Sequence, residues 1–323
     1  MATSRSWRQP LLDGPFRARL DDIGELNQVF SDAFTERYRR DGMVGVRVPF
    51  LNPTIWRYAI EDADDGAMLW RDERGHVGAF NMVHRSGVEG WMGPLAVRTE
   101  QQGSGFGKEV VTRGVEWLKA QGCAVIGLET MPRTMDNIGF YSRQGFTPGR
   151  LTLTTTIDSG YADEACDLLS KRSPSARAEA IAECRGLISG LHPGYDHTRE
   201  IELTADLGLG DTVLLYEHDR LIAYALAHTA PLVEGRSREE LRVLKLVLAD
   251  ESRFVDVVRS AADFGRRAGT RRVALRMQGE YTSAYQRLIV MGGHVRWTDL
   301  RMSLAGYNER PPASGLVLSN WEI

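Results

Sequence analysis

The sequence contains few cysteines, almost no net charge and no long apolar run, and each shortage excludes a class of protein. Its three cysteines lie far apart in no CxxC or Cys–His spacing, so we expect buried thiols rather than disulfides or a metal site. The net charge of −3 gives no attraction for nucleic acid, whose binders usually carry a basic excess. No apolar run could cross a bilayer, and residues 1–17 lack the apolar core of a signal peptide. We therefore expect a cytoplasmic protein with no membrane, nucleic-acid or metal partner.

The composition that remains is typical of a globular protein, and the length of 323 residues favours two domains. Hydrophobic periodicity and turn signals in residues 16–157 predict the element order β-α-α-β-β-β-α-β-α-β. Residues 176–304 repeat this plan, and aligning Gly122 with Gly269 places helix on helix and strand on strand. The predicted organisation is an arm at 1–15, a domain at 16–160, a linker at 161–175 and a domain at 176–323. The sequence leaves open whether the chain is a monomer or a homodimer.

The segment from Gln102 to Gly107 connects a predicted strand to a predicted helix and contains three glycines. Glycine lets the main chain approach a ligand closely, and the first amides of a helix are unpaired and electropositive. Together they predict a pyrophosphate-binding turn, with Lys108 at its rim. A Walker motif would need glycine in place of Gln102, and a dinucleotide fingerprint would need glycine at Lys108 or Val110.

The pattern Gln102-x-x-Gly105-x-Gly107 resembles the acetyl-CoA loop of the GNAT acetyltransferase superfamily. Further along, Asn137, Tyr141 and the pair Gly145-Phe146 look like the signature of the following helix and strand in that family. The resemblance covers residues 17–157 by motif and 176–304 by architecture alone. It implies an α/β (α+β) protein of two tandem GNAT folds, each a mixed, mostly antiparallel twisted sheet flanked by helices. The fourth and fifth strands of the first fold would splay apart to form the cofactor cleft.

The resemblance also implies the co-substrate and the residues that contact it. Acetyl-CoA would lay its pantetheine arm along the edge of Ala96 and Val97 and its pyrophosphate on the loop amides, and Asn137 would bond the arm near the thiol. Tyr141 would protonate the departing thiolate, as a phenol with a reference pKa of about 10 can do. The residues expected to contact the cofactor are Leu95, Ala96, Val97, Gln102, Gly103, Ser104, Gly105, Phe106, Gly107, Lys108, Asn137 and Tyr141.

The amine acceptor must lose a proton before it attacks, since an alkyl ammonium has a pKa near about 10. Glu89 is a tentative base, and His84 and Glu129 are alternatives, but no motif chooses among them. The sequence therefore favours an N-acetyltransferase, a GNAT-type acyltransferase, acting on a primary amine of a small molecule. The alternatives are a protein or peptide N-acetyltransferase and a non-catalytic acyl-CoA-binding module.

The second predicted domain has lost the chemistry of the first. The segment equivalent to the loop, Ala249 to Phe254, contains no glycine and places Asp250 and Glu251 where a pyrophosphate would lie. The position equivalent to Tyr141 falls within Arg287-Leu288-Ile289, which offers no general acid. We expect this degenerate domain not to bind coenzyme A.

Overall fold

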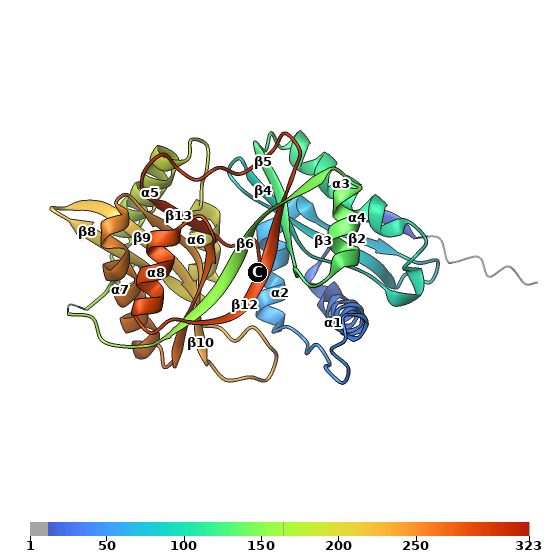
Figure 1. The fold of residues 1–323 in the computed structure, drawn as a ribbon, viewed down its shortest axis with the longest axis horizontal. Helices are drawn as coiled ribbons and strands as arrows, with labels where there is room; N and C mark the ends of the chain where they lie inside the picture. The colour runs from blue at the N-terminus through green and yellow to red at the C-terminus, as the bar shows by residue number, and fades with distance from the viewer. Residues whose placement is uncertain (1–11, 164, 323) are drawn as a thin grey trace, which may run out of the picture.

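The structure is a computed structural model that describes residues 12–163 and 165–322 (Figure 1). The first half contains β1 (Asp13–Arg17), α1 (Ile23–Arg40), α2 (Pro53–Ala63), β2 (Ala67–Arg71), β3 (Val77–Ser86), β4 (Glu89–Val97), α3 (Phe106–Ala120), β5 (Val125–Thr130), α4 (Met135–Ser142) and β6 (Phe146–Asp158). The second half contains β7 (Asp167–Leu168), α5 (Pro174–Leu191), α6 (Thr198–Asp206), β8 (Gly210–Glu217), β9 (Arg220–His228), β10 (Glu240–Leu248), α7 (Phe254–Arg267), β11 (Arg272–Gln278), α8 (Thr282–Val290), β12 (His294–Leu304) and β13 (Leu316–Ser319). The element order predicted for the first half is confirmed, and the duplicated α/β plan is present in the second.

Two predicted segments, the arm and the linker, can be compared with the elements of the structure. Residues 1–11 of the predicted arm lie outside the described residues, whereas Asp13–Pro15 belong to β1, which pairs with β2. The predicted linker at 161–175 contains β7, which pairs with β8, and the start of α5, where Ser173 caps the helix and Pro174 follows it. β7 and the start of α5 are therefore packed parts of the second half. The limits of the two domains stay a prediction.

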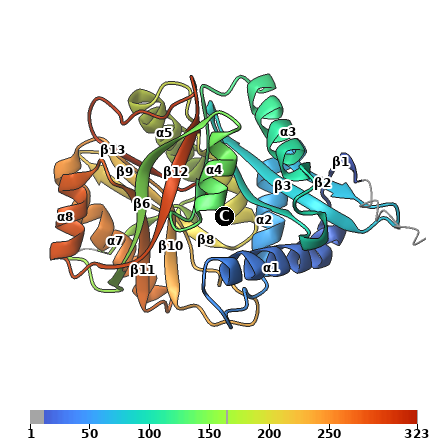
Figure 2. The ribbon, with the colours of Figure 1, turned by 45° about the vertical axis from the view of Figure 1, so that its right-hand side comes forward.

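The two halves share one 13-stranded sheet in the order β1-β2-β3-β4-β5-β12-β6-β11-β10-β9-β8-β7, with β13 paired to β10. The halves exchange a strand: β12 lies beside β5 of the first half, and β6 lies beside β11 of the second. Figures 1 and 2 both show β6 and β12 side by side between the two halves. The first half therefore completes its sheet only with a strand from the second.

In each half two neighbouring parallel strands pair over part of their length and then separate. Within the described residues, the gap of the second half is filled by another strand, and the gap of the first half is not. β4 and β5 pair from Glu89↔Val125 to Met92↔Leu128, and in the described residues no pair joins them beyond that point. In the second half β10 and β11 pair only from Glu240 to Arg242 on β10. There β13 takes the free edge of β10 in antiparallel register, from Lys245↔Ser319 to Leu248↔Leu316.

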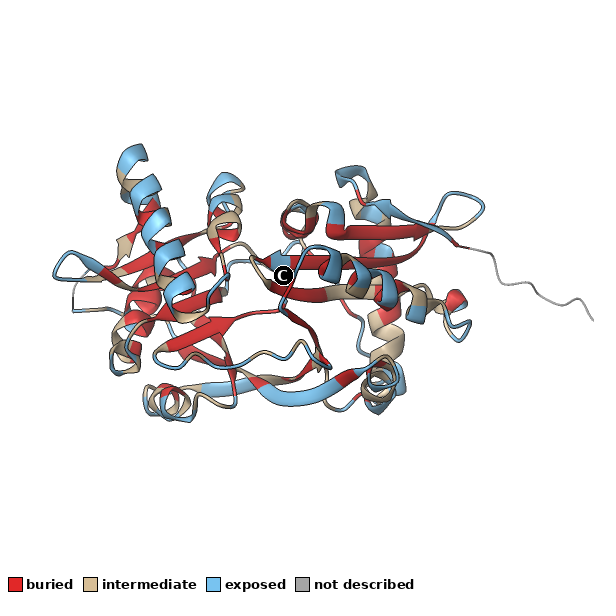
Figure 3. Ribbon diagram, turned by 90° about the horizontal axis from the view of Figure 1, so that it is seen from above, coloured by how far each residue is buried: buried red, intermediate tan, exposed pale blue. Residues whose placement is uncertain are grey.

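The core lies on both faces of the sheet. One hydrophobic cluster runs across both halves beneath α1, α2, α5 and α6, and includes Trp56, Tyr224 and Trp321. The opposite face is covered separately, by α3 and α4 in the first half and by α7 and α8 in the second. Figure 3 shows buried central strands between helices whose outer sides are exposed. Of the helices in residues 12–163 and 165–322, none is both long and apolar enough to span a membrane.

Candidate active site

The predicted phosphate turn has an open main chain. Gly103 and Gly105 adopt φ of +79° and +87°, a conformation that favours glycine, and both are exposed. Side chains fasten the turn from outside: Gln102 Nε2 donates to Val97 O (2.9 Å) and Ser104 Oγ to Gln101 O (2.6 Å). No described group accepts from the main-chain N–H of Gly103, Ser104 or Gly105. Three free donors at the start of α3 therefore face solvent, as an anion site requires.

The glycine at the second position of α3 has a different role. A Cβ on Gly107 would lie 3.4 Å from the Phe140 ring, so the glycine permits close packing of α3 on α4. Phe106, half-buried beside it, packs edge-on against Trp70 at 6.0 Å. Lys108 is exposed, as expected for a residue at the rim.

The expected cofactor cleft corresponds to the gap between β4 and β5. Beyond Met92, the main-chain edge of β4 that faces β5 carries Leu95, Ala96 and Val97, which pair only with β3 on the other side. Leu95 and Val97 are half-buried, and Ala96 is buried. An extended amide-containing chain could add to this edge as a further strand would.

Tyr141 and Asn137 project from α4 next to this cleft. Asn137 Nδ2 lies 3.5 Å from the hydroxyl of Thr130, the last residue of β5. Tyr141 is 7% exposed, and burial raises its pKa well above the usual value of a phenol. Within the described chain its hydroxyl bonds to no other group, while its ring packs edge-on against Phe140 (5.2 Å) and Phe146 (6.1 Å). The phenol is thus protonated at neutral pH and free to donate.

Glu89, the base suggested from the sequence, is fully buried. Its Oε1 accepts from Trp321 Nε1 (2.8 Å), and its Oε2 accepts from Ser319 Oγ (2.7 Å). Both oxygens are therefore engaged with the segment that follows β12. This geometry argues against a role in taking a proton from a substrate, and favours an anchor between the halves.

The two alternative bases are also engaged. His84 is fully buried, stacks on Trp91 at 4.1 Å and bonds through Nδ1 to Asp62 (2.6 Å). Glu129 accepts from Arg276 (2.6 Å) and from Arg301 (3.3 Å). Burial alone would raise the pKa of Glu129, but the two guanidinium groups outweigh it and the pKa is lowered. Nε2 of His84 has no partner among the described residues but is buried away from solvent, whereas both oxygens of Glu129 accept hydrogen bonds.

A set of residues that sequence reasoning missed surrounds Glu129 on the same side of the sheet. Arg276 of β11 also bonds to Asp299 of β12 (3.0 Å) and to Glu322 (2.8 Å). Trp297 Nε1 donates to Asp299 (3.2 Å). These residues are far apart in the sequence and belong to no motif, so only the strand exchange brings them to the site.

The second half lacks the open turn. Asp250 Oδ1 accepts from the main-chain N–H of Ser252 (2.9 Å), and Arg287 donates to Glu251 O (2.7 Å). The first amide at this end is therefore bonded within the protein, and the adjacent cleft is filled by β13. No described cluster of three or more His, Cys, Asp or Glu side chains is arranged to bind a metal ion.

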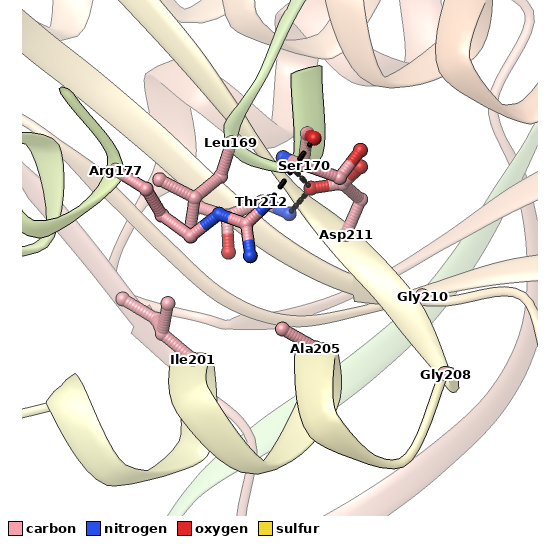
Figure 4. Close-up of a pocket in the computed structure, with 9 residues that line it drawn as sticks. All are labelled: Leu169, Ser170, Arg177, Ile201, Ala205, Gly208, Gly210, Asp211 and Thr212. Carbon is pink, nitrogen blue, oxygen red and sulfur yellow. Dashed lines mark hydrogen bonds between the residues drawn. The ribbon is translucent and has the colours of Figure 1, made fainter. Parts of the chain in front are cut away.

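A cavity of about 310 Å³ lies elsewhere, between α6 and β8 of the second half (Figure 4). Arg177 donates to Ser170 O (3.2 Å), and Asp211 accepts from the amides of Ser170 (3.1 Å) and Thr212 (2.8 Å). The remaining lining residues are Leu169, Ile201, Ala205, Gly208 and Gly210. Nε of Arg177 has no partner among the described residues, and none of the lining residues comes from the loop, the cleft or β12.

Comparison with known proteins agrees with this geometry. The model of the acetyltransferase (GNAT) family matches residues 26–146. A Pyrococcus horikoshii protein proposed to be an acetyltransferase is 15% identical with a TM-score of 0.66, over 99% of this chain and 98% of that one. A tandem GNAT protein from the clavulanic acid biosynthesis pathway is 10% identical with a TM-score of 0.56, over 91% and 98%. Saccharomyces cerevisiae N-myristoyltransferase, with bound myristoyl-CoA, is 9% identical with a TM-score of 0.62, over 95% and 85%. None of the curated proteins matches the sequence.

The match identifies residues 26–146 as a GNAT acetyltransferase domain, which supports acyl transfer as an activity of this part of the chain. Over its whole length the chain has the fold of a tandem GNAT protein.

Proposed function

We propose that this chain is an N-acetyltransferase that moves an acetyl group from acetyl-CoA to the primary amine of a small molecule. The observation that carries the proposal is the conjunction, in one half only, of a turn with three free amides, an unpaired strand edge and a protonated phenol without a partner. The other half keeps the fold without these features. A ligand best explains the difference.

The residues of the first half fit acetyl-CoA in each of its parts. The amides of Gly103, Ser104 and Gly105 would take the pyrophosphate, and the edge of Leu95 to Val97 would take the amides of the pantetheine arm. Bound there, acetyl-CoA supplies an activated acetyl group as a thioester. Tyr141 would give its proton to the departing sulfur, and burial keeps that proton in place until it is needed.

A small acceptor is favoured because the second half covers the opposite side of the sheet. The segment before α2 is fixed to the loop between β9 and β10 by a bridge from Leu51 to Val233 and by a bond from Asn52 N to Leu232 O (2.9 Å). Trp321 lies over β5, and its carbonyl would be 3.8 Å from a Cβ on Gly93. These contacts favour a covered acceptor site over an open groove that could hold a polypeptide.

The proposal is tested by incubating the full chain with acetyl-CoA and a panel of primary amines, including a peptide, and measuring free thiol together with the acetylated product. We expect acetylation of at least one small amine, with far slower reaction of the peptide. Preferred acetylation of the peptide would favour the protein-directed alternative. Tight acetyl-CoA binding without transfer to any amine would indicate the non-catalytic binding module instead.

A further inference from the structure

The cavity between α6 and β8 is built into the second half. Protein interiors are close-packed, so a hollow of about 310 Å³ between a helix and a strand needs a physical reason. The helix cannot settle onto the strand, because it is fixed near both of its ends. Glu200 near its start bonds to Ser86 of β3, and the hydroxyl of Thr204 near its end bonds to His228 of β9 (2.9 Å).

Two side chains of opposite charge line this cavity, and neither forms a salt bridge with a described residue. Arg177 of α5 donates through Nη2 to Ser170 O (3.2 Å), and its Nη1 bonds to no described group. Asp211 of β8 accepts both of its hydrogen bonds on Oδ1, from the amides of Ser170 (3.1 Å) and Thr212 (2.8 Å). Its Oδ2 is left without a partner in the described chain. Neither Nη1 nor Oδ2 is among the atoms shielded from solvent, so both are open to a ligand.

The two charged groups are neighbours that the main chain holds apart. One bonds to the carbonyl of Ser170 and the other to its amide, yet no salt bridge joins Arg177 to Asp211. Figure 4 shows Arg177 extending toward Ser170 and Asp211, with Ile201 and Ala205 of α6 across the cavity. Because these bonds fix both side chains in advance, a ligand would not have to order them. A molecule between them should present a carboxylate to the guanidinium and an ammonium ion to the carboxylate.

The rest of the lining sets the size and the polarity of the ligand. The volume of about 310 Å³ lies at the lower end of the range of about 300–1,000 Å³ for small-molecule sites. Leu169 and Ile201, both buried, form an apolar wall. Ala205 and Gly208 are small and leave room beside this wall. An aliphatic group placed there would be removed from water, which favours binding.

We propose that this cavity is a binding site for a free α-amino acid with an aliphatic side chain, separate from the site of acetyl transfer. The ligand carboxylate binds Arg177, its ammonium group binds Asp211, and its side chain packs on Leu169 and Ile201. All of the lining residues belong to the second half. The half without an acetyl-CoA turn therefore has a ligand of its own, whether or not the first half transfers acetyl groups.

The test is a calorimetric titration of the full chain, without acetyl-CoA, with L-leucine and two analogues that each lack one charged group. Isocaproate lacks the ammonium group, and isoamylamine lacks the carboxylate. We expect leucine to bind and each analogue to bind about 10-fold more weakly or less, because one charged pair is lost. An analogue that binds as tightly as leucine would overturn the inference. So would the absence of binding by leucine and by every other aliphatic amino acid.

Variants assign the binding to the cavity. Arg177→Gln and Asp211→Asn should each raise the Kd for leucine about 10-fold or more, and Arg177→Lys, which keeps the charge, should recover part of the loss. Asparagine retains an oxygen for the two amides that Asp211 now accepts from. Arg172→Gln is the matched control: Arg172 pairs with Asp167 and does not line the cavity, so the Kd should not change. If a variant fails to fold, the analogues still decide the question on the native chain.

The outcomes separate this site from the site of the first half. Leucine binding with an unchanged Kd in folded Arg177→Gln and Asp211→Asn would mean that the amino acid binds elsewhere, as an acceptor would, and would overturn the inference. Failure of acetyl transfer to every amine would leave the inference standing, because the titration uses no acetyl-CoA.

Discussion

The two halves share one plan of helices and strands, but they treat the gap between their parallel strands in opposite ways. In the first half the edge of β4 beyond Met92 is left open, and in the second the equivalent edge of β10 is taken by β13. The turn before α3 has free amides, while Asp250 caps the turn before α7 with its own side chain. The comparison shows that the fold needs neither glycines nor an open cleft. What the second half fills with its own chain, the first half leaves open, and we propose that a ligand binds there.

The largest effect should come from removing the hydroxyl of Tyr141, and the same change at Tyr281 in the second half is its control. Tyr141→Phe should lower kcat about 10²- to 10⁴-fold, because the departing sulfur loses its proton donor. Tyr281→Phe is the matched change: the Tyr281 hydroxyl donates to Val317 O (3.0 Å), so this variant should lose about 1 kcal/mol of stability and keep its kcat. Steady-state kinetics and urea unfolding measure both. Equal kcat in the native chain and in folded Tyr141→Phe would remove Tyr141 from the role.

The segment after β13 should contribute strongly to stability. Trp321 is buried, covers Gly127, donates to Glu89 (2.8 Å) and has Arg301 at 3.5 Å from its ring. Trp321→Ala should cost about 3–5 kcal/mol in the free energy of unfolding, since it leaves a large cavity and removes the hydrogen bond to Oε1 of Glu89. Trp117→Ala, at a half-buried position on α3, should cost about 1 kcal/mol. Urea denaturation followed by circular dichroism compares the two, and equal losses would contradict the anchoring role.

Gly105 in the first half and Gly269 in the second allow a matched comparison. A side chain should strain the backbone equally at both positions, but only Gly105 lies in the proposed binding site. Gly105 and Gly269 have φ of +87° and +79°, and a Cβ on either would meet nothing within 4 Å. Valine at either position should therefore cost about 1–2 kcal/mol of stability. Only Gly105→Val should also raise the Kd for acetyl-CoA, by about 100-fold or roughly 2.7 kcal/mol, because the side chain obstructs the approach of the pyrophosphate. Calorimetric titration measures the binding; an unaltered Kd would show that the turn is not the phosphate site.

The smallest effect concerns a carboxylate where the halves meet. Glu200 of α6 bonds to Ser86 of β3 and lies 3.6 Å from Lys245, and burial raises its pKa from 4.5 to about 7. The folded protein thus binds this proton more tightly than the unfolded chain, so stability is greatest below pH 4.5 for this group and falls as the pH rises to about 7. Glu200→Gln should flatten this fall, which amounts to about 1–3 kcal/mol. Urea unfolding at several pH values measures it. Exposed Glu202→Gln should behave as the native chain, and a native-like slope in Glu200→Gln would count against the assignment.

Much of the first half could be predicted because its signals are local. The hydrophobic periods and the glycine stops at Gly122 and Gly145 predicted the helices, and the spacing of Gln102, Gly105 and Gly107 predicted a turn with free amides. The short elements β7, α6 and β13 of the second half were missed. β13 is only four residues long, and its pairing with β10 comes from a contact about 70 residues apart in the sequence.

The partners of the buried charged groups around β5 and β12 could not have been predicted in the same way. Glu89, a strand residue of ordinary type, gave no sign that Trp321 and Ser319 would cover it. Asp299, Arg276 and Glu322 gave no signal at all, since each is an isolated charged residue in the sequence. Their meeting depends on which neighbour each strand takes.

The sequence by itself determined the α/β duplication, the open glycine turn at Gln102 to Gly107, and the difference between the two copies of that turn. These depend on residue types within a few positions of one another, which local geometry translates directly into structure. Only the tertiary structure decided that β6 and β12 change places, that β13 fills the second cleft, and that Asp299 stands beside Glu129. Either strand could satisfy the same hydrogen bonds in either half, so the choice rests on packing between distant segments that no local pattern encodes.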